Sequence, residues 1–378
     1  MRLKLKPLAE QVIVITGASS GIGLATAKKA AQAGAAVVLV ARSETALKLA
    51  SDEINAQGGR AHYVVADVGN PEDVAKVGRA ALARFGGFDT WVNDAGVGVY
   101  GDAAEIPIED HERVFRTNYF GVVNGSIEAL KHLRARGGAI INVGSILSDI
   151  AAPLMSAYSA SKHAVKGFTD SLRIELLREG APVSVSLIKP SSIATPFPEH
   201  ARNFMDKPAR VPPPVYAPEV VADAILHAAV HPVRQITVGA GGRQMVLTGA
   251  AAPRFADRFF GAVIPALSTR KGRKPRTDSL YEPGVDGEVH SAHVGSGRRF
   301  SVYTEAQKHR GLVLGVGLLA LAAAAAWAGR GRLEKVKPLV RQAVRRTALK
   351  AARRHPLKAA RLAARHPRQA LKLANALR

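Results

Sequence analysis

The stretch Thr16-Gly-Ala-Ser-Ser-Gly-Ile-Gly23 decides the fold of this chain. It follows the apolar run Val12–Thr16 and opens a stretch with the composition of a helix, Gly23–Ala33. Its three glycines allow a tight turn and let backbone N–H groups approach a pyrophosphate, and a helix N-terminus adds partial positive charge. We therefore interpret the stretch as a phosphate-binding turn between a strand and a helix, although some glycine-rich turns after a strand bind nothing.

The same alternation of β-branched runs and helical stretches continues as far as residue 190. The expected strands are Val12–Thr16, Ala36–Ala41, Ala61–Ala66, Thr90–Asn93, Ala139–Val143 and Val183–Ile188. The expected helices are Gly23–Ala33, Glu44–Ala56, Pro71–Phe85, Glu109–Arg136 and Ala157–Glu179. Strands that are apolar throughout and alternate with helices indicate a parallel sheet covered on both faces. The expected fold is α/β, a doubly wound, Rossmann-like parallel sheet.

Beyond residue 190 the chain first becomes irregular and then returns to regular structure. The segment 191–218 is rich in proline, which forbids a regular helix, and a loop of this length in a compact domain usually serves function. We expect it to close over a substrate. A helix at Glu219–Val230, a strand at Gln235–Val238 and a helix at Ala251–Leu267 would complete one catalytic domain spanning 11–268.

The composition excludes several classes of chemistry. Hydrophobic residues make up 47% of the 378 residues, enough for a sizeable core. There are no cysteines, which excludes disulfides, thiolate chemistry and Cys-bound zinc. His290 and His293 have no strong acidic partners nearby in sequence, so no metal site is expected. The basic lead 1–10 is followed by an apolar run too short for a secretion signal, and we expect a cytoplasmic location.

The C-terminal extension divides into three parts by composition. Residues 269–310, rich in Gly, Pro, Ser and charge, are expected to be a linker or a segment draped over the domain. Residues 311–328 carry no charge and would span about 27 Å as a helix, close to the thickness of a bilayer core. The tail 329–378 has sixteen Lys and Arg residues against Glu334, so it carries +15 of the net charge of +23.

Apolar residues followed by a basic tail favour association with an anionic membrane surface. A simple spanning helix would send the tail across the membrane, against the positive-inside tendency, so an interfacial or re-entrant segment is the better hypothesis. Two alternatives stay open. The tail could bind nucleic acid, which its lack of aromatic residues disfavours, or both parts could be solvated appendages.

A candidate pair for acid–base chemistry lies in Tyr158-Ser-Ala-Ser-Lys162. Residues four apart share a helix face, and an ammonium near a phenol favours phenolate and lowers its pKa from about 10. Such a phenol can exchange a proton with a substrate oxygen. Ser145 ends a predicted strand thirteen residues earlier, and its hydroxyl could polarise a carbonyl.

The second predicted strand ends at Arg42, where a carboxylate would bind a ribose 2′-hydroxyl and repel a 2′-phosphate. A guanidinium can instead bind a phosphate through two hydrogen bonds. Arg42 therefore favours NADP(H) over NAD(H), unless it is a solvated surface residue.

Together these residues resemble the short-chain dehydrogenase/reductase family, whose cofactor turn reads TGxxxGIG. The resemblance covers about residues 9–240 and implies an Asn118, Ser145, Tyr158 and Lys162 catalytic set, with Asn118 holding a water that relays protons to the lysine. It implies that Asp67 contacts the adenine, unless this acid only caps a helix, and that Thr195 holds the nicotinamide carboxamide. The implied cofactor-binding residues are Thr16, Gly17, Ser19, Ser20, Gly21, Ile22, Gly23, Arg42, Asp67, Val68, Asn93, Ala95, Gly96, Tyr158, Lys162, Pro190 and Thr195.

Two positions depart from the family pattern. Asp94 stands where the family usually has a second asparagine in Asn-Asn-Ala-Gly, and Ser191 replaces the glycine of a Pro-Gly pair. The first departure puts local hydrogen bonding in doubt, and the second the conformation of the following loop.

The sequence thus predicts an NADP(H)-dependent oxidoreductase that interconverts a carbonyl and a secondary alcohol, with Tyr158 as general acid/base and a lipophilic substrate. One alternative is epimerase chemistry through a ketone intermediate. The other is a membrane-associated nucleotide-binding scaffold without turnover. A homo-oligomer is a further possibility, since members of the family often pair through two long helices.

Overall fold

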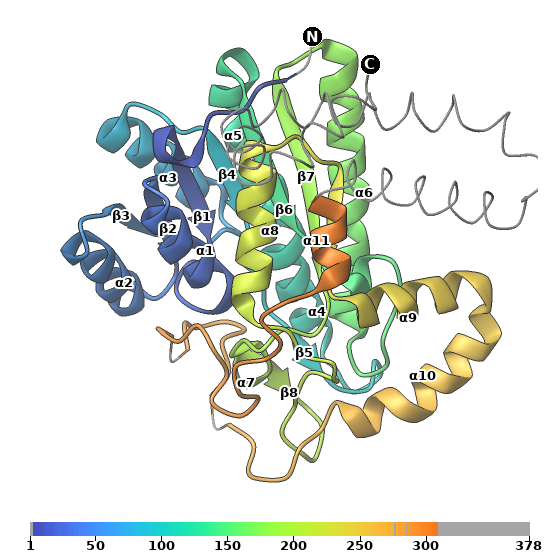
Figure 1. Ribbon diagram of the computed structural model, residues 1–378. Coiled ribbons are helices and arrows are strands. Elements are labelled where there is room, and N and C mark those ends of the chain that lie inside the picture. Colours follow the sequence, from blue (N-terminus) through green and yellow to red (C-terminus); the bar gives the residue numbers. More distant parts are fainter. Residues whose placement is uncertain (1–2, 276, 285, 309–378) are drawn as a thin grey trace, which may run out of the picture. The chain divides into compact units, whose positions relative to one another are not determined.

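The structure, a computed structural model, describes residues 3–275, 277–284 and 286–308 (Figure 1). The chain divides into two units, Met1–Lys308 and His309–Arg378, and the fold below is that of the first. The apolar run 311–328 and the basic tail lie outside the described residues. No helix among the described residues is long and apolar enough to cross a membrane.

A seven-stranded parallel sheet forms the centre of the fold (Figure 1). Its spatial order is β3 (Arg60–Val65), β2 (Ala36–Ala41), β1 (Val12–Thr16), β4 (Thr90–Asn93), β6 (Gly138–Val143), β7 (Val183–Pro190) and β9 (Gln235–Val238). The order reverses between β1 and β4, and such a switch point opens a crevice beyond the carboxyl ends of the strands. The predicted doubly wound α/β fold is confirmed.

Helices cover both faces of the sheet. One face carries α1 (Gly21–Gln32), α2 (Glu44–Ala56) and α8 (Pro218–Val230), and the other carries α3 (Pro71–Phe85), α5 (Gly121–Arg136) and α6 (Ser156–Glu179).

Successive strand residues enter opposite cores, which explains why the strands are apolar throughout. Ile13 and Ile15 pack on the α1 side, whereas Val14 packs on the α3 side, and all three are fully buried. Burying each such side chain stabilises the fold by about 1.5–3 kcal/mol. A polar residue at any of these alternating positions would therefore face a core.

One expected helix is interrupted. The sequence predicted a continuous helix over Glu109–Arg136, but a π-helical turn at Arg116–Phe120 separates α4 (Ile108–Phe115) from α5. The extra residue in a π turn re-aims the side chains within it, and such turns are frequent at functional sites. Asn118 lies in this turn and is fully buried.

The C-terminal part of the first unit holds two helices that the sequence did not suggest, besides the predicted one that ends at Leu267. Helix α9 (Ala240–Ala251) forms despite three glycines and, with α10 (Pro253–Leu267), makes an arm that projects from the body (Figure 1). Helix α11 (Val302–Lys308) lies against the edge strand β9, where the Gln307 side chain bonds both the N–H and the C=O of Thr237 at 3.0 and 2.7 Å. The helix thereby covers a sheet edge that would otherwise be open to pairing.

Candidate active site

A cleft of about 500 Å³ opens at the carboxyl ends of β1, β4, β6 and β7. The glycine turn lies at one end, and Tyr158, Lys162 and Ser145 lie farther along it. Apolar side chains from the loop after β7 and from α10 form part of the remaining walls. A cleft of this size at a switch point suits a cofactor and a small substrate together.

The glycine turn is built by close backbone contact. A Cβ on Gly23 would lie 2.2 Å from the Gly17 carbonyl oxygen, and one on Gly17 would lie 2.8 Å from the Ala95 backbone. Gly17 also has a φ of +73°, which side-chain-bearing residues rarely adopt. Larger residues at either position would push the turn and the β4 loop apart. Ser19, Ser20, Gly21 and Ile22 line the cleft beside this turn.

Two predicted cofactor residues lie behind the cleft wall. The Thr16 hydroxyl accepts hydrogen bonds from the Asp94 and Ala95 N–H groups at 3.1 and 3.2 Å, tying β1 to the loop after β4. The Asn93 amide donates to the Asn142 side chain at 2.8 Å and accepts from the Trp91 indole at 2.8 Å, fully inside the core. Both residues shape the site by holding the main chain that borders it.

Asp94, where the family pattern has asparagine, is held by the glycine turn. Its carboxylate accepts a hydrogen bond from the Gly23 N–H. Burial raises the pKa of Asp94, while the nearby Lys162 ammonium and the Gly23 hydrogen bond act the other way. Burial likewise lowers the pKa of Lys162, and the charge of Asp94 opposes that shift. The acid is thus accommodated because it receives a backbone N–H and faces a cation.

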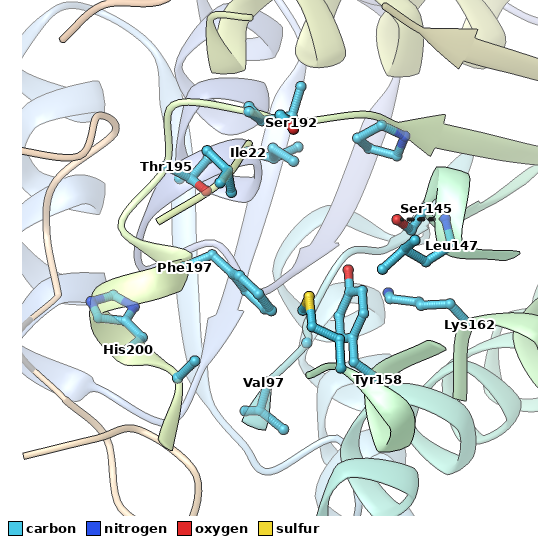
Figure 2. Close-up of a pocket in the computed structure, with 18 of the residues that line it drawn as sticks. Ile22, Val97, Ser145, Leu147, Tyr158, Lys162, Ser192, Thr195, Phe197 and His200 are labelled. Carbon is cyan, nitrogen blue, oxygen red and sulfur yellow. Dashed lines mark hydrogen bonds between the residues drawn. The ribbon is translucent and has the colours of Figure 1, made fainter. Parts of the chain in front are cut away.

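Tyr158, Ser145 and Lys162 converge in the middle of the cleft (Figure 2). The Lys162 ammonium donates to the Val143 carbonyl at 2.9 Å and lies 5.6 Å from the centre of the Tyr158 ring. The Ser145 hydroxyl accepts from the Leu147 N–H at 3.1 Å and is hydrogen-bonded to the Tyr158 phenol. The phenol therefore points at a space bordered by a hydroxyl on one side and a cation on the other.

The pKa of Tyr158 moves opposite to the direction that the Tyr158–Lys162 spacing predicts. Burial raises the pKa of the phenol well above its usual value, the Ser145 hydrogen bond opposes this rise, and Asp94 adds to it. The predicted lowering was wrong because it considered only the lysine charge. Desolvation of the phenol, which depends on the folded structure, raises the pKa instead. At neutral pH the phenol consequently carries its proton.

Asn118 is placed beside this set but does not line the cleft. Its amide accepts from the Val97 N–H at 2.8 Å and donates to the Val97 carbonyl and the Ser161 hydroxyl, each at 3.0 Å. Both of its donors are used, so the side chain fixes the loop after β4 against α6. No sequence pattern indicated the roles of Ser161, of Val97 or of the Val143 carbonyl that holds Lys162.

The other end of the cleft carries Arg42 and Asp67. Asp67 pairs with Arg113 at 2.7 Å and accepts from the Gly69 N–H at 2.9 Å. Burial raises the pKa of Asp67, but these two hydrogen bonds and the charges of Arg113 and Arg42 together lower it below its usual value. Val68, Gly96, Pro190 and Thr195 also border the cleft, so most of the predicted cofactor residues lie along one continuous surface.

This arrangement agrees with what comparison with known proteins finds. The family model described as short chain dehydrogenase matches residues 11–206, more than half of the chain. The chain belongs to this family. It is an oxidoreductase of the short-chain dehydrogenase/reductase type that depends on a nicotinamide cofactor.

Relatives and solved structures support the assignment. The chain is 45% identical over 330 residues to "Uncharacterized oxidoreductase YxnA" of Bacillus subtilis, covering 85% of this chain and 93% of the relative. A short-chain dehydrogenase/reductase from Burkholderia phymatum, solved with NAD, has a TM-score of 0.61 at 27% identity over 66% of this chain and 96% of that one. An alcohol dehydrogenase from Thermococcus sibiricus, complexed with 5-hydroxy-NADP, has a TM-score of 0.53 at 27% identity over 60% and 95%.

The family model matches this short-chain dehydrogenase/reductase only as far as residue 206, but residues beyond that point also line the cleft. Residues of α10, such as Phe260 and Ile264, form part of its apolar wall, and Ser279, Pro283 and Asp286 border its other end. These contributions come from chain that follows the matched segment, and the sequence motifs gave no indication of them.

Proposed function

We propose that this enzyme interconverts a lipophilic carbonyl compound and the corresponding secondary alcohol, with NADP(H) preferred over NAD(H). The observation that carries the proposal is the Tyr158 hydroxyl, which lies in the cleft between Ser145 and Lys162 while the glycine turn borders the same cleft.

The residues fit a nicotinamide dinucleotide. The glycine turn at the start of α1 brings backbone N–H groups to the cleft, and the cleft runs on to Tyr158 and Thr195. When bound, the nicotinamide supplies or accepts the hydride.

The side chains of the protein would position the substrate and donate the proton. The Ser145 hydroxyl and the Tyr158 phenol would both donate to the substrate carbonyl oxygen and fix its position. In reduction, Tyr158 then passes its proton to that oxygen as the oxygen becomes an alcohol. Lys162, held by the Val143 carbonyl, stabilises the phenolate left behind. Burial raises the pKa of the phenol, so at neutral pH it carries the proton that this step transfers.

Arg42 supports the NADP(H) preference. Its guanidinium borders the cleft at the end of β2, where the ribose of a dinucleotide would lie. A carboxylate here would bind a ribose 2′-hydroxyl and repel a 2′-phosphate. The Asp67 carboxylate is not free to do so, because it is already paired with Arg113.

The lining beyond Tyr158 supports a lipophilic substrate. The side chains that form it are predominantly apolar: Val97, Leu147, Met155, Phe197, Val211, Met245, Phe260, Val263, Ile264 and Leu267. The Phe197 ring lies 5.3 Å from the Tyr158 ring, so an apolar group attached to the carbonyl would contact it directly.

Consumption of NADPH and NADH by the full-length chain tests this function with matched ketones that differ in alkyl length. We expect NADPH to support faster turnover, and kcat/KM to rise about tenfold for every two methylenes buried, at about 0.8 kcal/mol each. Faster turnover with NADH would contradict the cofactor preference. A preference for short polar ketones would contradict the substrate class.

We also propose that the enzyme associates with anionic membranes, a property supported by the outer face of α10. Phe255 and Phe259 are 59% and 48% exposed and stack on each other at 5.7 Å, flanked by Arg254 and Arg258. Exposed aromatic rings beside arginines suit the interface of an anionic bilayer. Phe259 also borders the cleft, so a lipophilic substrate could enter there from the membrane.

Flotation of the full-length chain with phosphatidylcholine vesicles containing phosphatidylglycerol tests the membrane proposal. We expect Phe255→Ser to weaken vesicle binding by about tenfold, since a buried phenyl ring contributes about 1.5–3 kcal/mol. Phe300→Ser is the matched control, because Phe300 is 63% exposed but lies outside the arm. Equal binding by the two variants would refute docking through α10.

A further inference from the structure

A segment near the end of the first unit crosses the cofactor end of the cleft. We call residues 278–284 and 286–291 the strap; it runs in orange past the loops at the carboxyl ends of the strands (Figure 1). The Gly287 N–H donates to the Ser19 carbonyl, and the Gly21 N–H donates to the Glu288 carbonyl, both at 2.9 Å. The strap is therefore bonded, main chain to main chain, to both sides of the phosphate-binding turn.

Both ends of the strap are fastened to the body. At one end Leu280 is fully buried in a cluster with Val99, Ile106 and Val114, and the Tyr281 hydroxyl donates to Asp110 at 2.9 Å. Detaching this end from the body would expose the buried Leu280 side chain to water, which is unfavourable.

The other end is fastened to the loop after β7. The Ser291 N–H donates to the Ala194 carbonyl at 3.0 Å and its hydroxyl donates to Glu199 at 2.6 Å, while His290 contacts Glu219 at 3.0 Å. With both ends fixed, the middle of the strap is held over the cleft.

Three backbone carbonyls of the strap also accept hydrogen bonds from Arg42. Nη1 donates to the Tyr281 carbonyl at 2.6 Å and to the Leu280 carbonyl at 3.4 Å, and Nη2 donates to the Ser279 carbonyl. Three of the five guanidinium N–H groups are thereby used. Nε has no hydrogen-bond partner among the described residues, so its N–H and one Nη2 hydrogen remain as donors for phosphate oxygens.

Of the two arginines at the cofactor end of the cleft, Arg42 is the one suited to bind an anion. Arg113 also donates to the Leu280 carbonyl, at 2.9 Å, but its charge is balanced by Asp67 at 2.7 Å. The direct partners of Arg42 are neutral carbonyls, and the carboxylates of Asp67, Glu282 and Asp286 act on it from farther away.

We infer that the strap is part of the cofactor site and that it determines recognition of the 2′-phosphate, by holding the Arg42 guanidinium at the cleft so that its remaining donors bind the phosphate. This inference rests on the proposed NADP(H) function. A flexible arginine loses rotamer entropy when it binds a ligand, whereas one already held by three carbonyls has lost it beforehand. The strap therefore contributes more to binding of the phosphorylated nucleotide than to binding of the plain one.

A double-mutant cycle on the full-length chain tests the inference, with dissociation constants measured for NADPH and NADH. Leu280→Ala loosens the strap anchor, and Ile106→Ala is the matched control because it opens a cavity in the same cluster outside the strap. We expect Leu280→Ala to weaken NADPH about tenfold more than it weakens NADH, and Ile106→Ala to leave the ratio of the two constants unchanged. In an Arg42→Ala background, Leu280→Ala should no longer change that ratio.

The possible results distinguish failure of the strap's proposed role from failure of the proposed NADP(H)-dependent function. A ratio that Leu280→Ala leaves unchanged, in an enzyme that prefers NADPH, would overturn the role of the strap and leave the proposed function standing. The same change of ratio with and without Arg42 would also overturn it, because the strap would then act through another group. A wild-type chain that binds neither nucleotide would instead refute the proposed function.

Discussion

Replacing Tyr158 with phenylalanine is expected to lower kcat by about three orders of magnitude while changing the dissociation constant of the cofactor by less than about twofold. The variant removes one oxygen atom and keeps the ring that packs 5.3 Å from Phe197. Loss of the phenol leaves the developing alkoxide without a proton donor, whereas the glycine turn and Arg42 are untouched. Single-turnover rates and cofactor titration on the same preparation measure the two effects.

Tyr100→Phe is the matched control for that variant. Tyr100 is buried and borders the same cleft, so the change has the same size and the same surroundings. We expect its kcat to stay within a few-fold of wild type. Equal losses in the two variants would mean that the Tyr158 hydroxyl has no special role, and turnover by Tyr158→Phe at the wild-type rate would refute the mechanism.

Replacing Asp149 with asparagine is expected to destabilise the fold by about 3 kcal/mol. Asp149 follows the short helical turn Ile146–Ser148 after Ser145, and its carboxylate bonds Lys189 at 2.6 Å and Lys166 at 2.5 Å. The Lys189 side chain is only 3% exposed, so the variant leaves a buried cation without its charged partner. Urea denaturation of both proteins at neutral pH measures the difference in the free energy of unfolding.

The pH dependence of that difference checks its electrostatic origin. Burial raises the pKa of Asp149, but the hydrogen bonds from Lys166 and Lys189 outweigh it and hold the pKa below its usual value. The carboxylate therefore contributes stability above the unfolded-state pKa of about 3.9, and this contribution is lost as the pH falls through the folded-state pKa. The gap between wild type and Asp149→Asn should consequently shrink in acid.

Asp52→Asn provides the control for a surface pair. Asp52 pairs with Lys48 at 2.6 Å, and both side chains are about 60% exposed. We expect a loss within the error of the measurement, because water and salt screen such pairs. A loss from Asp149→Asn no larger than this would show that the buried cation is satisfied in another way.

The sequence by itself determined the features that depend on local patterns. The apolar runs Val12–Thr16 and Thr90–Asn93 became β1 and β4 with the predicted bounds, because an apolar strand can be buried only inside a covered sheet. The turn after β1 followed from its glycines, whose close contacts exclude any larger residue. Tyr158 and Lys162 share a helix face because four residues make about one turn.

The tertiary structure alone decided the features that depend on burial and on distant partners. The direction of the Tyr158 pKa shift came from desolvation, which no spacing of residues encodes. The π turn that places Asn118 leaves the apolar periodicity of a helix almost intact, so the sequence predicted an uninterrupted helix. The partner of Arg42 at the Leu280 carbonyl lies 238 positions along the chain, in a segment whose composition indicates only a linker or draped chain. A backbone carbonyl is the same in every residue, so its position near a guanidinium is set by the fold and leaves no trace in the sequence.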